Sequence, residues 1–81
     1  MDVLYFAWVR ERIGHPKDRV ETTAVTVRDL VEELRAREPR YEAAFADLDA
    51  LRVAVDQELA DFDAPLAGAR EVAFFPPMTG G

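Results

Sequence analysis

The sequence contains no cysteine, and this absence removes several kinds of chemistry at once. Disulfide bonds, thiolate nucleophiles, cysteine zinc sites and iron–sulfur clusters all require the thiol group. The single histidine, His15, has no second histidine with which to form a ligand set, and its Gly-Pro surroundings predict a solvated loop residue. The single lysine, Lys17, falls in a predicted polar loop and is not placed as a Schiff-base nucleophile. We therefore predict no metal site.

Positive charge and long apolar runs are also scarce. The chain has ten basic and sixteen acidic side chains. The resulting net charge of −6 would repel a phosphate backbone, so we expect no nucleic-acid partner. No apolar run approaches the ~18 residues needed to span a bilayer. The opening residues Met1-Asp2 show neither the positive nor the apolar region of a signal peptide. These features predict a soluble, cytoplasmic protein without a membrane segment.

The chain has 81 residues, of which 49% are hydrophobic, and this length suits one small domain. No repeat, low-complexity segment or linker interrupts it. We predict a globular domain over residues 1–75 and an extended C-terminal tail over residues 76–81 that ends in Gly-Gly.

Two strands are expected in the first part of the chain. Residues 3–9 read VLYFAWV and are apolar at both alternating sets of positions, which predicts a central strand covered on both faces. A polar turn with Gly14 and Pro16 follows, and residues 19–23 predict a weaker, edge-like strand.

One main helix is expected next. Thr26 and Asp29 have the spacing of a capping box, and Pro39 restricts the residue before it and ends the helix. The helix has an apolar stripe at i, i+3, i+4 and i+7 formed by Val27, Leu30, Val31 and Leu34. A second, minor helix is predicted after Pro39, because residues 41–48 repeat the same spacing.

The remaining elements are strands and turns. Residues 51–55 and 58–60 predict a tight hairpin around Asp56-Gln57, residues 61–68 a loop, and residues 71–75 a last strand. Strands that precede and follow a helix in this order indicate the α+β class, with one mixed sheet and the main helix packed across it.

The most specific feature is the C-terminal segment FFPPMTGG, residues 74–81. Pro76 and Pro77 lack the N–H group needed for strand pairing, so they end the last strand and direct the chain away along an extended path. Residues 77–81 can reach up to ~18 Å, far enough to enter a deep cleft of a partner. Gly80 and Gly81 have no side chain to obstruct a narrow channel or to crowd an attack on the terminal carboxylate.

A free carboxylate is a poor electrophile, but its anhydride with AMP reacts with sulfur and nitrogen nucleophiles. This chain has no phosphate-binding glycine loop, because Gly14 and Gly68 stand alone in the sequence. A second protein must therefore supply the ATP site. Taken alone, a terminal diglycine could also be an ordinary frayed end.

Together with the early segment FAWVRE, residues 6–11, and the segment VAVDQ, residues 53–57, the tail resembles the ubiquitin-like sulfur carrier family that includes the small subunits of molybdopterin synthase. The resemblance covers nearly the whole chain. It implies a ubiquitin-like β-grasp fold in which the first and last strands lie side by side at the centre of the sheet.

The resemblance also implies a function in molybdenum cofactor biosynthesis. An E1-like adenylyltransferase would use ATP to adenylate Gly81, the carboxylate would become a thiocarboxylate, and the tail would enter the large subunit of the synthase. Sulfur would pass there to cyclic pyranopterin monophosphate. The implied assembly is a heterotetramer of two small and two large subunits, in which this chain is not catalytic alone and binds no cofactor itself.

The implied site residues fall in two groups. The threaded tail comprises Pro76, Pro77, Met78, Thr79 and Gly80, with the sulfur on Gly81. The implied partner contacts are Phe6, Arg10, Leu59 and Phe75, although Leu59 and Phe75 could instead be ordinary core residues. Met78 stands where a smaller aliphatic residue is common in the family, and the adaptable methionine side chain leaves the fit to a channel little changed.

Three alternatives remain open. The chain could be a carrier of the same fold for thiamine thiazole synthesis, a ubiquitin-like modifier joined to lysines, or a plain interaction module in which the diglycine does nothing. For the carrier function, the acidic surface is expected to dock on basic or mixed-charge patches of both partners, so that association weakens with salt.

Overall fold

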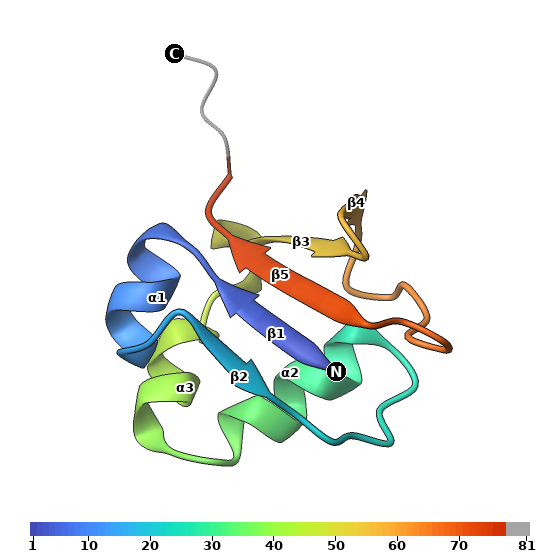
Figure 1. Cartoon of the computed structure of the whole chain (residues 1–81). Helices are drawn as coiled ribbons and strands as arrows, with labels where there is room; N and C mark the ends of the chain where they lie inside the picture. The colour runs from blue at the N-terminus through green and yellow to red at the C-terminus, as the bar shows by residue number, and fades with distance from the viewer. Residues whose placement is uncertain (78–81) are drawn as a thin grey trace.

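The computed structural model describes residues 1–77. In chain order the elements are β1 (Asp2–Tyr5), α1 (Ala7–Ile13), β2 (Lys17–Arg19), α2 (Val27–Arg35), α3 (Pro39–Ala44), the 3-10 helix η1 (Leu48–Ala50), β3 (Arg52–Val55), β4 (Glu58–Ala60) and β5 (Glu71–Phe75). The strands form one mixed sheet in the order β2-β1-β5-β3-β4 (Figure 1). β1 runs parallel to β5, and every other neighbouring pair is antiparallel. The prediction that the first and last strands lie together at the centre is confirmed.

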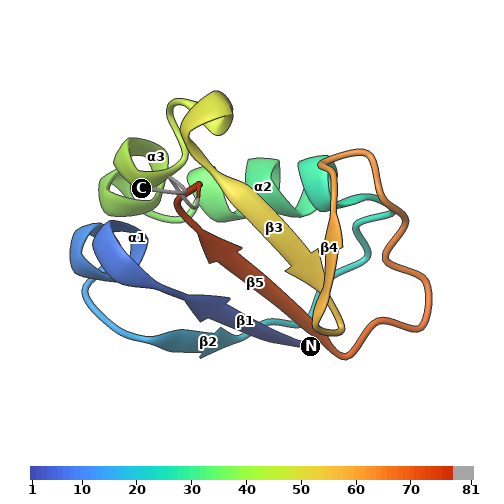
Figure 2. The ribbon, with the colours of Figure 1, turned by 90° about the horizontal axis from the view of Figure 1, so that it is seen from above.

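α2 is the longest helix, and α2 and α3 lie on one side of the sheet (Figure 2). The predicted capping box is present, since the Asp29 amide donates to Thr26 Oγ1 at 3.2 Å and the Thr26 amide donates to Asp29 Oδ2 at 3.3 Å. The predicted apolar stripe is fully buried and consists of Val27, Leu30, Val31 and Leu34. The same sequence period that predicted the helix therefore also fixes which face it turns to the sheet.

The prediction of one strand over residues 3–9 is wrong. The strand ends at Tyr5, and Ala7 has a φ of 52°, a left-handed conformation that turns the chain into α1. Val9 and Ile13 are buried at i, i+4 on this helix, and Gly14 ends it with a φ of 99°. A short apolar run fits a strand or a buried helical segment equally well. Here the first part of the run forms β1 and the second part forms α1.

The second strand lies earlier in the chain than predicted. β2 covers Lys17–Arg19 rather than residues 19–23, because the Tyr5 amide bonds to the Pro16 carbonyl and pairing begins directly after that proline. Lys17 thus belongs to a strand and not to a loop. β2 is an edge strand, as expected.

The second half of the chain follows the prediction closely. α3 begins at Pro39, where a missing N–H group does not disturb a helix. The hairpin of β3 and β4 turns through Asp56 and Gln57, whose φ angles are 49° and 70°. Both angles are positive, as a type I′ turn requires. The expectation of one main helix with one minor helix omits α1 and η1.

Candidate functional site: the tail exit and the outer sheet face

The exit of the tail is built on β5, the middle strand of the sheet. β5 pairs with β1 on one side and β3 on the other, and its last residue, Phe75, is in register with Arg52. Pro76 and Pro77 follow directly and cannot extend the pairing. The chain therefore leaves the sheet at its most firmly held strand. The predicted tail residues Met78, Thr79, Gly80 and Gly81 lie outside the described residues.

β5 is held at both ends. At its start, Asp56 Oδ1 accepts hydrogen bonds from the Arg70 amide at 2.9 Å and the Glu71 amide at 3.0 Å. Near its end, the buried Phe74 ring packs edge-on against Phe45, with ring centroids 4.9 Å apart. These contacts give the tail a fixed point of departure. From the sequence, Asp56 was predicted only as a turn residue, and this second function was not predicted.

The sheet has two unlike faces, because side chains alternate along each strand. The inner face packs against the helices and consists of Val3, Tyr5, Val53, Val72 and Phe74. On the opposite, outer face, one row of residues in mutual register crosses all five strands: Lys17, Leu4, Ala73, Ala54 and Leu59. Apart from the lysine at one end, this row is apolar.

The outer face is only partly hidden from solvent. Leu59 on the edge strand β4 is 75% exposed, and Phe6 at the start of α1 is 46% exposed. Phe75 and Leu4 are half-buried. The expectation that residues 3–9 are covered on both faces is wrong for this reason, since no described element packs over Leu4 and its neighbours.

Three of the four predicted contact residues lie near the tail exit. The Phe6 amide donates to the Phe74 carbonyl at 3.1 Å, so the β1 backbone continues beside β5 and Phe6 projects on the same side as Phe75. Arg10 lies one helical turn after Phe6 and is exposed, and its amide reaches the Phe6 carbonyl at 3.5 Å. Phe6 and Phe75 thus lie beside the exit and Arg10 one helical turn away, while Leu59 lies farther along the outer face on β4.

A polar cluster lies at the same end of β1 as the tail exit, but on the inner side of the sheet. The hydroxyls of Tyr5 and Tyr41 donate to Asp18 Oδ2 at 2.9 Å and 2.7 Å, and His15 Nε2 lies 2.9 Å from Asp18 Oδ1. His15 also packs edge-on against both tyrosine rings. His15 lies in a loop, as expected, but its ring is partly buried and engaged in these contacts, so the expectation that it is solvated is wrong.

The cluster holds Asp18 in its charged form. Burial raises the pKa of the Asp18 carboxyl, but the hydrogen bonds from Tyr41, His15 and Tyr5 outweigh that effect, and the pKa lies below its ordinary value. Burial, followed by the bond to Asp18, raises the pKa of Tyr5. Both phenols therefore stay protonated as donors, and the cluster ties β1, β2 and α3 together.

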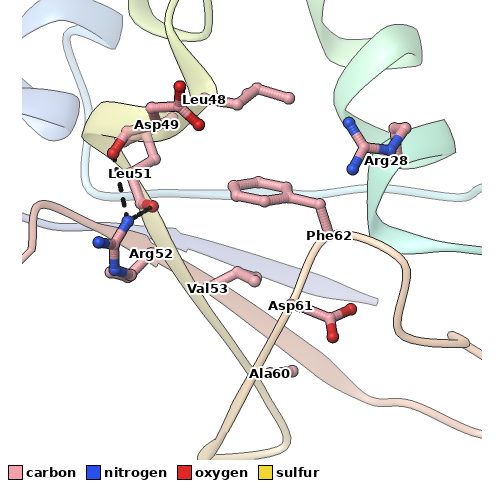
Figure 3. A pocket seen from close by; sticks show the side chains of 9 residues that line it. All are labelled: Arg28, Leu48, Asp49, Leu51, Arg52, Val53, Ala60, Asp61 and Phe62. Carbon is pink, nitrogen blue, oxygen red and sulfur yellow. Dashed lines mark hydrogen bonds between the residues drawn. The ribbon is translucent and has the colours of Figure 1, made fainter.

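A pocket of about 310 Å³ opens beside the β3–β4 hairpin (Figure 3). The two arginines that line it are already engaged within the protein. Arg52 donates to the carbonyls of Asp49 and Leu51 at 3.2 Å and 2.8 Å, and Arg28 pairs with Asp63 at 3.1 Å. The pocket offers an apolar wall and no set of side chains arranged for acid–base or nucleophilic chemistry.

The described part of the chain shows no metal centre, since residues 1–77 contain no group of three or more histidine, cysteine, aspartate or glutamate side chains able to hold an ion. Within the same residues, every helix is too short or too polar to cross a membrane. The candidate site of the described residues is therefore a partly exposed apolar sheet face beside the end of β5.

A family model described as "ThiS family" matches residues 3–81. The chain belongs to the ThiS family. The match includes the sheet, the helices and the diglycine tail, so the resemblance stated from the tail and from residues 6–11 and 53–57 is confirmed.

Curated relatives of this ThiS family member are named as sulfur carriers. The chain is 44% identical over 79 residues to the molybdopterin synthase sulfur carrier subunit of Escherichia coli, covering 98% of this chain and 96% of that protein. The subunits of Haemophilus influenzae and Mycobacterium tuberculosis are 33% and 35% identical, and the matches cover all of this chain and 99% and 96% of those proteins.

Solved structures give the same fold. Small archaeal modifier protein 1 of Haloferax volcanii superposes with a TM-score of 0.77 at 30% identity, covering 96% of this chain and 97% of that protein. A second crystal structure of the Haloferax volcanii protein gives a TM-score of 0.78 at 31% identity and covers the whole of this chain and 98% of its own. The ubiquitin-like β-grasp architecture expected from the resemblance is thereby confirmed.

Proposed function

We propose that this chain is the sulfur carrier subunit of a molybdopterin synthase and that Gly81 is its sulfur-bearing residue. The observation that supports the proposal most directly is the full-length similarity to three sulfur carrier subunits of that synthase. It is supported further by the sequence PPMTGG, which directly follows the central strand β5.

The proposed chemistry requires a partner at every step. An E1-like adenylyltransferase joins the Gly81 carboxylate to AMP and releases pyrophosphate from ATP. A sulfur donor then displaces AMP, and the terminus becomes a thiocarboxylate. The globule, residues 1–75, holds the tail, residues 76–81, at a fixed exit while the tail enters the large subunit, where sulfur passes to cyclic pyranopterin monophosphate.

The outer face is the proposed docking surface in this cycle. Phe6, Leu59 and Phe75 supply exposed apolar area, and Arg10 supplies a charged rim beside the exit. A partner that covers this face also covers the exit, so the activating enzyme and the large subunit would bind in turn. We place the chain, with two copies beside two large subunits, in the cytoplasm.

Charge on the same surface indicates the chemistry of the partner. From Asp47 to Asp63 the chain has six carboxylates and one arginine, and Leu59 lies within this segment. A basic or mixed-charge partner surface complements it. Raising the salt concentration should lower the association rate, whereas an affinity independent of ionic strength would contradict this part of the proposal.

Deletion of Gly81 separates a carrier from a plain interaction module. The shortened chain should still bind the large subunit through the outer face, but it should support no molybdopterin formation in a reconstituted synthase. A module would keep its activity after the deletion. Loss of binding in the shortened chain would show instead that the tail itself dominates docking.

A modifier function is the second candidate, favoured by the structural similarity to a small archaeal modifier protein. A modifier forms amide bonds between its terminus and lysines of other proteins. Incubation with the activating enzyme, ATP and cell extract, followed by detection of the chain at higher mass, distinguishes the two. A carrier for thiamine thiazole synthesis would instead bind a thiazole synthase in preference to the large subunit.

A further inference from the structure

The turn between β1 and α1 is not stabilised by its own side chains. Phe6, the residue before the helix, makes no side-chain capping bond, and the first turn of α1 has no acidic side chain to stabilise its N-terminus. Ala7 has a φ of 52°, a left-handed conformation that a residue with a β-carbon rarely adopts. Contacts with the rest of the fold must therefore hold this turn in place.

Two backbone bonds attach the chain on either side of β1 just before the turn. The Tyr5 amide donates to the Pro16 carbonyl at 2.9 Å, and the Phe6 amide donates to the Phe74 carbonyl at 3.1 Å. The Val9 amide then donates back to the Phe6 carbonyl at 3.1 Å as the helix begins. Phe6 is thus the last residue at which the β1 segment is attached to β5.

The Tyr5 side chain gives a third attachment, on the inner side of the sheet. Its ring is buried, and its hydroxyl donates to Asp18 Oδ2 at 2.9 Å. Asp18 is itself held, because the Tyr41 hydroxyl donates to the same oxygen at 2.7 Å and His15 Nε2 lies 2.9 Å from the other oxygen. The residue directly before Phe6 is therefore fixed by a carboxylate on β2 that α3 also contacts.

The Phe6 side chain has few contacts of its own to hold it. It is 46% exposed and does not belong to the core cluster of the described residues or to the side chains packed against that cluster. Its direction therefore follows from the backbone, which the neighbouring Tyr5 anchors. A contact residue whose direction is fixed before binding loses less conformational freedom when a partner covers it.

We propose that Tyr5 is a positioning residue for partner docking: held by Asp18 on the inner side, it fixes the turn that presents Phe6 on the outer side, beside the tail exit. The inference rests on the proposed function, in which Phe6 contacts the large subunit. Tyr5 and Asp18 meet on the inner side of the sheet, away from the docking surface, so loss of their hydrogen bond removes no direct contact with the partner. The effect on binding acts through Phe6.

The test compares two tyrosines that donate to the same carboxylate oxygen. Tyr5→Phe and Tyr41→Phe each remove one hydroxyl from Asp18 Oδ2 and keep the ring, so both variants should fold and lose similar stability in urea unfolding. Only Tyr5 is adjacent to the turn. Tyr5→Phe should therefore weaken binding of the full chain to the large subunit about three- to tenfold, whereas Tyr41→Phe should weaken it less than about twofold.

Two further measurements separate positioning from a general loss of stability. In the Phe6→Ala background no ring remains to be positioned, so adding Tyr5→Phe should cause no further loss of affinity. Amide hydrogen exchange of the free chain gives a readout that needs no partner. The Phe6 amide, which donates to the Phe74 carbonyl, should exchange faster in Tyr5→Phe and at an unchanged rate in Tyr41→Phe.

The outcomes distinguish this inference from the proposed function. The positioning role of Tyr5 would be overturned by equal affinities of the two tyrosine variants, by a Tyr5→Phe effect that persists in Phe6→Ala, or by unchanged exchange of the Phe6 amide. A Phe6→Ala variant that binds as tightly as the unaltered chain would instead remove Phe6 from the proposed docking surface. Exchange of the Phe6 amide in the free chain would then still decide whether Tyr5 holds the turn.

Discussion

The inner and outer faces of the sheet are made by the same strands but differ in what covers them. Inner side chains such as Val3, Val72 and Phe74 are fully buried under the helices. Outer side chains such as Leu4 and Phe75 are apolar too, yet they remain half-buried, and Leu59 is largely exposed. The comparison teaches that the inner residues stabilise the fold, whereas the outer residues are available to a partner.

The largest expected effect comes from neighbouring phenylalanines on opposite faces. Phe74→Ala should lower the free energy of unfolding by about 3–5 kcal/mol, because it removes a buried ring that packs on Phe45. Phe75→Ala should cost less than about 2 kcal/mol, since the side chain is already half in solvent. Urea unfolding of both variants measures the difference. Equal losses would break the distinction between the faces.

Two carboxylates extend the comparison to polar groups. Asp18→Asn should cost about 1–3 kcal/mol at neutral pH, because it disturbs three partly buried hydrogen bonds. Asp2→Asn, which breaks an exposed pair with Arg19, should cost at most about 1 kcal/mol.

The effect of Asp18 should depend on pH in a defined direction. Its pKa is lower in the folded chain than its ordinary value of 3.8, so its stabilisation is fully present above that value. It is lost as the pH falls through the lower, folded pKa. Unfolding measured from pH 7 downward should therefore show the difference between Asp18→Asn and the unaltered chain shrinking in acid. A difference that grows in acid would contradict the account.

Leu59→Ser should affect binding rather than stability. Leu59 is 75% exposed, so the free energy of unfolding should change by no more than about 0.5 kcal/mol. Binding to the large subunit should weaken at least about tenfold if the side chain enters a partner pocket. Calorimetric titration measures this, with Val25→Ser, an exposed apolar residue that precedes α2, as the matched control. Unchanged affinity for Leu59→Ser would remove β4 from the docking surface.

The smallest expected effect lies in the turn that belongs to neither face. Gln57 has a φ of 70°, a conformation that favours glycine, so Gln57→Gly should stabilise the chain by no more than about 1 kcal/mol. Thermal unfolding measures the gain. Binding to the large subunit should not change, and a change would indicate that the hairpin turn also contacts the partner.

The parts of the fold that sequence patterns predicted are those in which local and tertiary preferences agree. α2 combines a capping box with a complete apolar stripe, and the hairpin combines alternation with a turn sequence. Residues 3–9 offered no such agreement. The run is apolar throughout, so no residue in it marks the turn at Phe6. Only the spacing of Val9 and Ile13, followed by Gly14, could have indicated α1.

The candidate site was predicted unevenly for the same reason. The tail residues were predicted from the chemistry of proline and glycine in the sequence itself. The four contact residues were predicted only from the family resemblance. The outer row was not predicted, because Leu4, Ala54 and Ala73 gather only when three distant strands pair in register. Neither was the cluster around Asp18, since His15 and Tyr41 are brought together by the packing of α3.

Intact mass after charging tests the central claim most directly. The full chain is incubated with its adenylyltransferase, ATP and a sulfur donor, and the C-terminal peptide is then mapped. The account predicts that one oxygen of the Gly81 carboxylate is replaced by sulfur and that the rest of the chain is unchanged. A terminus that stays a carboxylate while the E. coli relative is converted under the same conditions would contradict it.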